Sequence, residues 1–141
     1  MRQIKVIFDC NSWISFAMDG RLKKLELFLQ NPQFHIYSCQ ELLTEFDNVS
    51  KYPKLQKYLK PDLVQKAQEA IFTFLLSFQN IERPSISRDP DDDYLLYFSE
   101  EYGLDFLVTG DKDLLVLKTY GNTKICTFAE FVIEMENLKL I

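Results

Sequence analysis

The chain has 141 residues, 47% of them hydrophobic, which is enough to bury one substantial core and too few for two ordinary domains. No stretch has the composition of a disordered tail, and no apolar run approaches the roughly 20 residues that cross a bilayer. The net charge of −5 excludes a surface that is basic throughout. We therefore expect one domain, residues 1–141, with no membrane-spanning segment.

Cysteine and histidine are scarce, which limits the possible chemistry. Cys10, Cys39 and Cys126 are odd in number and far apart, so they predict neither a disulfide framework nor a CxxC metal site. A reducing cytoplasm is the expected location. With His35 as the single histidine, a His-rich zinc site is excluded, and a Ser/His/Asp or Cys/His relay would depend on that one residue.

The predicted elements alternate between strands and helices. In the first half of the chain, the pattern predicts a strand at 4–8, a helix at 21–30, a strand at 35–39 and helices at 41–49 and 61–78. In the second half, it predicts a brief strand from Ile81, a helix that begins after Asp89, a strand at 106–109, an apolar segment at 124–127 and a last helix at 128–138. Such alternation with short loops predicts an α/β fold with three layers, in which helices cover both faces of a central, mostly parallel, twisted sheet.

Acidic residues fall where these strands end. Asp9 ends the first strand, Asp111 follows the strand at 106–109, Glu45 lies early in the helix after the second strand, and Asp93 lies in the first turn of the acidic helix. The carboxyl ends of parallel strands share one edge of the sheet, where the functional crevice of such folds lies. We therefore expect these four carboxylates to converge.

Helix capping and turn formation explain one or two of these acids, but not four at the same edge. Carboxylates brought together repel each other, and a bound cation removes the repulsion. Oxygen ligands without His or Cys suit Mg²⁺ or Mn²⁺, which bridge to substrate phosphate. This is the chemistry of phosphodiester hydrolysis, in which the metal neutralises the phosphate and activates a water molecule.

Basic residues qualify the acidic net charge, because they are clustered along the chain. A nucleic-acid partner is therefore compatible with the composition, although solvated surface charge is the more common explanation of any one such group. The clustered residues are Arg21, Lys23 and Lys24, then Lys51, Lys54, Lys57 and Lys60, and then Arg83 and Arg88.

Four segments resemble the motifs of one known family. They are Asp9-Cys10-Asn11 with Ser15, Glu45 within Leu-Leu-Thr-Glu-Phe-Asp-Asn-Val, Arg88-Asp-Pro-Asp-Asp-Asp, and Val108-Thr-Gly-Asp-Lys-Asp-Leu-Leu. Together they resemble the PIN domain, and more narrowly the PIN proteins described as toxins of bacterial toxin-antitoxin pairs. The resemblance covers nearly the whole chain.

The resemblance implies a metal-dependent endoribonuclease with Mg²⁺ or Mn²⁺ as cofactor, an RNA substrate, a cognate antitoxin protein and a possible homodimer. The preference for RNA over DNA comes from the resemblance alone. The implied residues are Asp9, Glu45, Asp93 and Asp111 as catalytic and metal-binding acids, Asn11, Ser15 and Thr109 as polar support, and Asp91, Asp92 and Asp113 as close alternatives.

Three other interpretations compete with this one: two other kinds of phosphoryl-transfer domain and a non-enzymatic module. Aspartyl-phosphate phosphatases also begin with an apolar strand and an Asp, but they carry a second Asp two residues later, where this chain has Asn11. A signalling receiver domain needs an early acidic pair, which is missing. The non-enzymatic alternative is a PIN-like module that binds RNA or protein without catalysis, although such a module has no chemical need for all four acids.

Overall fold

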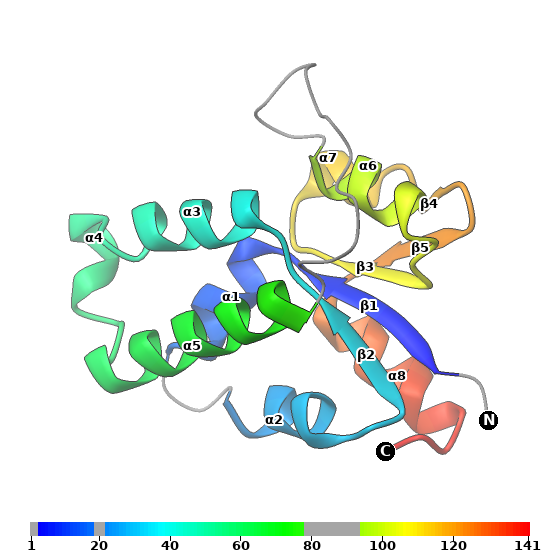
Figure 1. Cartoon of the computed structure of the whole chain (residues 1–141), viewed down its shortest axis with the longest axis horizontal. Coiled ribbons are helices and arrows are strands. Elements are labelled where there is room, and N and C mark those ends of the chain that lie inside the picture. Colours follow the sequence, from blue (N-terminus) through cyan, green and yellow to red (C-terminus); the bar gives the residue numbers. More distant parts are fainter. Residues whose placement is uncertain (1–2, 19–21, 78–93) are drawn as a thin grey trace.

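The computed structural model describes residues 3–18, 22–77 and 94–141 (Figure 1). The strands are β1 (Ile4–Phe8), β2 (Phe34–Tyr37), β3 (Phe106–Val108), β4 (Thr119–Tyr120) and β5 (Thr123–Cys126). The helices are α1 (Cys10–Phe16), α2 (Leu22–Gln30), α3 (Gln40–Val49), α4 (Pro53–Gln56), α5 (Pro61–Ser77), α6 (Tyr94–Glu101), α7 (Lys112–Leu115) and α8 (Phe128–Asn137). No helix within these ranges is long and apolar enough to cross a membrane.

The strands form one sheet in the order β2-β1-β3-β5-β4. β1 pairs in parallel with β2 and with β3, β3 pairs in parallel with β5, and the two-residue strand β4 is antiparallel to β5. The chain passes from β1 to β2 on one side and later returns to place β3 on the other side. In an open parallel sheet, a crevice forms at such a reversal, beyond the carboxyl ends of the strands. Here the reversal lies at β1 and β3.

Helices cover both faces of the sheet, as the strand sequences require, because neighbouring side chains of a strand point to opposite faces. On one face, Phe8 of β1 contacts Phe28 of α2 and Phe131 of α8, with ring centroids 6.4 and 5.9 Å apart. On the other face, Tyr37 of β2 contacts Phe98 of α6 at 6.1 Å. The three-layer α/β/α fold with a mostly parallel sheet is therefore confirmed.

The helices α3, α4 and α5 extend to one side of the sheet, the left in Figure 1, where α3 and α5 pack against each other and against α1. This arrangement matters for the site, because α3 begins just after the carboxyl end of β2. One long face of α3 therefore starts at the crevice and leads away from it.

The long elements agree with their sequence patterns to within one or two residues at each end. The patterns do not predict the short helices α1, α4 and α7 or the strand β4. Helices of four to seven residues span at most two turns, which is too short for a hydrophobic period to emerge. The strand expected from Ile81 and the helix start expected after Asp89 lie outside the described residues.

Candidate active site

Asp9 connects β1 to α1 and lies at the carboxyl end of β1. Its side chain is 5% exposed. Oδ1 accepts hydrogen bonds from the backbone N–H of Ser12 at 2.9 Å and from the Ser12 hydroxyl at 2.8 Å. The first bond makes Asp9 the N-cap of α1. Because both donors come from the first turn of α1, the carboxylate is held in one orientation.

Thr109 links Asp9 to the strand on its other side. The Thr109 side chain is 1% exposed, and its hydroxyl donates a 2.6 Å hydrogen bond to Oδ2 of Asp9. The same oxygen atom of Thr109 accepts from the backbone N–H of Asp111 at 3.0 Å. The Gly110 N–H also points at Oδ2 of Asp9, at 3.4 Å. One hydroxyl therefore positions both the Asp9 carboxylate and the backbone of Asp111.

Asp111 follows β3 and caps the short helix α7, because its Oδ1 accepts from the N–H of Asp113 at 2.9 Å. Asp9 and Asp111 thus occupy equivalent places, each between a parallel strand and the helix that follows it. Adjacent strands that end at the same edge bring these two acids to the same crevice.

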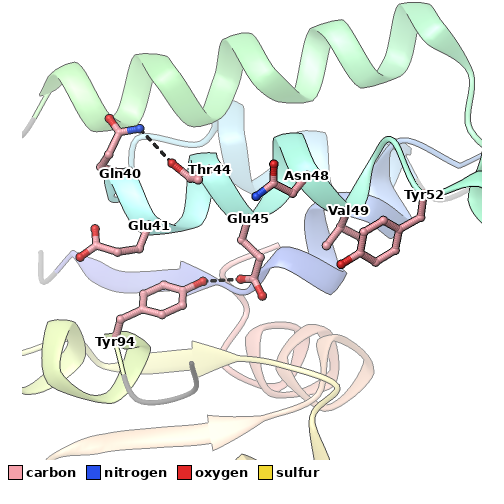
Figure 2. A pocket seen from close by; sticks show the side chains of 8 residues that line it. All are labelled: Gln40, Glu41, Thr44, Glu45, Asn48, Val49, Tyr52 and Tyr94. Carbon is pink, nitrogen blue, oxygen red and sulfur yellow. Dashed lines mark hydrogen bonds between the residues drawn. The ribbon is translucent and has the colours of Figure 1, made fainter. Parts of the chain in front are cut away.

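Glu45 approaches the crevice from α3, and its partner is Tyr94 at the start of α6. The Tyr94 hydroxyl donates a 2.6 Å hydrogen bond to Oε1 of Glu45, as Figure 2 shows. Burial raises the pKa of Tyr94, and the bond to the Glu45 carboxylate raises it further. The tyrosine therefore stays a neutral donor at physiological pH, and it holds one oxygen atom of Glu45.

The three acids Asp9, Glu45 and Asp111 line one pocket with a volume of about 90 Å³. They reach it from the end of β1, from α3 and from the end of β3. The other described residues that line it are Cys10, Asn11, Val49, Tyr94, Leu95, Thr109 and Leu114. Asn11 and Thr109, which were expected as polar support, are among them. Ser15 lies on α1 and Asp113 on α7, and neither lines the pocket.

The pKa of the Cys10 thiol reflects the burial and the negative charge of this pocket. Burial raises its pKa, and the charges of Glu45 and Asp9 raise it further. The thiol is therefore protonated when no metal ion is bound. Apart from this thiol, the polar side chains that line the pocket carry carboxylate, hydroxyl, phenol and amide groups, whose hard oxygen donors suit Mg²⁺ or Mn²⁺.

The described part of the chain contains no group of three His, Cys, Asp or Glu side chains close enough to hold a metal ion. Asp93 and its alternatives Asp91 and Asp92 lie outside that part. Mg²⁺ keeps several water ligands and is often bound through one or two carboxylates together with substrate phosphate. The donors that line the pocket fit such an ion in kind, as an open site and not as a closed cage.

Two residues of the site escaped the sequence analysis. Ser12 holds Asp9, and its place three residues after a strand-ending Asp is the N3 position of a capped helix, which could have pointed to it. Tyr94 holds Glu45 across 49 positions of sequence. A tyrosine at the start of a largely buried helix has no local pattern that distinguishes it from a core residue.

A second pocket, with a volume of about 540 Å³, adjoins the first and shares Glu45, Val49 and Tyr94 with it (Figure 2). It follows one face of α3. The remaining residues that line it are Gln40, Glu41, Thr44, Asn48 and Tyr52.

Comparison with known proteins supports the relationship that the motifs indicate. The family model described as PIN domain matches residues 5–113, which include Asp9, Glu45, Thr109 and Asp111. No curated protein matches the chain. PIN domains are generally nucleases. Because the match covers most of the sequence and all the described acids of the pocket, the chain belongs to the PIN domain family.

Proposed function

We propose that this PIN domain is a metal-dependent ribonuclease that hydrolyses RNA phosphodiester bonds at Asp9, Glu45 and Asp111, with Asp93 as the fourth acid. The observation that carries the proposal is that three carboxylates from separate elements line one pocket at the carboxyl edge of the sheet. Structural capping alone would account for Asp9 and Asp111. It does not account for Glu45, which lies in the middle of α3 and turns toward the same pocket.

Each residue has a definite task in this proposal. Bound Mg²⁺ or Mn²⁺ supplies charge neutralisation and a water molecule of lowered pKa. Ser12 and Thr109 hold the Asp9 carboxylate, and Tyr94 holds one oxygen atom of Glu45 while the other is left for a ligand. Asn11 is exposed at the rim, where its amide can donate to a phosphate oxygen atom.

We further propose a biological setting: the toxin of a type II toxin-antitoxin pair, active in the cytoplasm, inhibited by a cognate antitoxin and able to form a homodimer. The motif resemblance to PIN toxins supports the first part. The three cysteines, all buried and none in a disulfide, fit a reducing compartment. Growth arrest on expression, relieved by the neighbouring gene product, is the expected result. Unaffected growth and no co-purifying partner would remove the toxin role and leave the nuclease role intact.

The nuclease proposal is tested with purified native chain and the variants Asp9→Asn, Glu45→Gln and Glu136→Gln. Glu136 is exposed on α8, outside the residues that line the pocket, so its variant is the matched control for loss of one carboxylate. We expect Mn²⁺ to switch on cleavage of single-stranded RNA by the native chain and by Glu136→Gln. Asp9→Asn and Glu45→Gln should be inactive, because each lacks one anionic oxygen ligand.

Thermal unfolding in Mn²⁺, combined with the cleavage assay, distinguishes a nuclease from a module that only binds metal. An ion that binds only the folded state stabilises it by about 2.7 kcal/mol at a hundred times its dissociation constant. We expect this shift in the native chain and in Glu136→Gln, and a smaller one in Asp9→Asn. Equal shifts in all variants would mean that the ion binds elsewhere. A selective shift without cleavage of any nucleic acid would replace the enzyme with a metal-binding module.

A further inference from the structure

The groove along α3 continues the carboxylate pocket away from the sheet. Glu41, Glu45, Asn48, Val49 and Tyr52 follow one another at the spacing of one helical face, and the last of them lies just beyond the end of α3. Because Glu45, Val49 and Tyr94 line both pockets, a chain-like ligand bound at the acids can pass directly into the groove. Its volume of about 540 Å³ lies in the range of sites for small organic ligands.

The side chains of the groove suit a nucleotide base better than a phosphate group. Beside Glu45, its middle is lined by the neutral polar side chains of Thr44 and Asn48, both of which are exposed. The Asn48 amide carries both donors and an acceptor, which is what the hydrogen-bonding edge of a base requires. At the far end, Tyr52 is 46% exposed and offers an aromatic face on which an unpaired base can stack.

Charge gives the groove a direction. Lys51 and Lys54 flank Tyr52 in sequence at the end of the groove farther from the start of α3, and both are exposed. A polyanion that passes the acids is therefore attracted toward Tyr52.

We infer that this groove, defined by Asn48 and Tyr52, binds the single-stranded segment of the substrate beside the bond that is cut. One base stacks on Tyr52, the Asn48 amide contacts a base edge, and the backbone leaves toward Lys51 and Lys54. The inference rests on the proposed nuclease function and adds the place where the unpaired strand lies and the residues that hold it. It applies to an unpaired strand because the bases of a duplex have no free face to stack on the ring.

The test is equilibrium binding of a labelled single-stranded oligoribonucleotide in EDTA, with gel analysis to check that it stays intact. Tyr52→Ala should weaken binding about tenfold or more, as expected for the loss of one stacked base. Tyr52→Phe keeps the ring and should bind within about twofold of the native chain on the same reasoning. Tyr58→Ala is the matched control, because Tyr58 is also an exposed tyrosine, at 56% against 46% for Tyr52, and does not line the groove. Binding of a duplex of the same sequence should not depend on Tyr52.

The outcomes distinguish this inference from the function on which it rests. No binding of the single strand, or equal losses in Tyr52→Ala and Tyr58→Ala, would overturn the groove assignment even if the native chain cuts RNA with Mn²⁺. A selective loss in Tyr52→Ala without any cleavage by the native chain would support the groove and reject the nuclease. Thermal melts of all variants check that they are folded. Because Tyr52 is exposed, we expect its replacement to lower the free energy of unfolding only slightly.

Discussion

At the scale of single residues, Asp9 combines a structural and a chemical task. Its carboxylate is buried and accepts from Ser12 and from Thr109, so each of its oxygen atoms has a donor before any ligand arrives. Burying a carboxylate without such donors is costly, which explains why hydroxyl residues surround it. The sequence predicted Asp9 and Thr109 as members of the site. It did not predict the hydrogen bond from the Thr109 hydroxyl to the Asp9 carboxylate.

Replacing Thr109 with Val should test the two hydrogen bonds of the Thr109 hydroxyl. Valine keeps the shape and removes the hydroxyl, so Oδ2 of Asp9 loses its short hydrogen bond and the N–H of Asp111 loses its acceptor. We expect the free energy of unfolding to fall by about 1–3 kcal/mol. Urea unfolding measures the change, and Thr109→Ser, which keeps the hydroxyl, should recover most of it. An unchanged midpoint in Thr109→Val would mean that the hydroxyl does not support the site.

At the scale of elements, three helices begin at a capping residue that lies shortly after a strand. Asp9 caps α1, Asp111 caps α7 and Thr127 caps α8, and each lies within three residues after the end of a parallel strand. A short polar residue at that place accepts from the free N–H groups of the first turn. Two of these caps line the pocket, whereas the Thr127 cap does not, so capping and function can be separated experimentally.

The cap of α8 is a reciprocal one. Thr127 accepts from the backbone N–H of Glu130 at 3.1 Å, and the Glu130 carboxylate accepts from the N–H of Thr127 at 2.9 Å. Thr127→Ala removes half of this capping box, and we expect a loss of about 1 kcal/mol in the free energy of unfolding with cleavage activity unchanged. Thr127→Ser is the control and should resemble the native chain. A loss of activity at unchanged stability would contradict a purely structural cap.

At the scale of the whole molecule, the core holds the thiols of Cys10 and Cys126 in neutral form. Cys126 is buried in β5, and burial together with the charges of Glu130 and Glu134 raises its pKa to about 12. Cys10 is shifted in the same direction by burial and by the carboxylates of the site. An unfolded thiol has a pKa near 8.5, so the unfolded chain loses protons that the folded chain keeps.

Stability should therefore decrease in alkaline solution. A raised pKa contributes stability that is complete below the unfolded value and disappears as the pH rises toward the folded value. For Cys126 this window runs from about 8.5, the unfolded pKa, to about 12 in the fold. Within it each such thiol lowers the free energy of unfolding by about 1.4 kcal/mol per pH unit.

Urea unfolding of the native chain and of Cys126→Ala between about pH 8 and pH 10, a range set by the thiol pKa, measures this slope. The variant should be less stable at neutral pH, because a small cavity replaces the thiol, but its stability should fall less steeply with pH. If the free energy of unfolding fell equally steeply with pH in the two proteins, Cys126 would have the same pKa in the folded and unfolded states.

The sequence by itself determined the α/β class, the long strands and helices, and the acids that follow β1 and β3, because apolar periodicity and turn residues act over a few neighbouring positions. Only the tertiary structure decided which elements meet. Thr109 reaches Asp9 across 100 positions and Tyr94 reaches Glu45 across 49. Both contacts depend on the strand order β2-β1-β3 and on the placement of α3 and α6 around it. That order results from packing the whole core at once, and no local pattern encodes it.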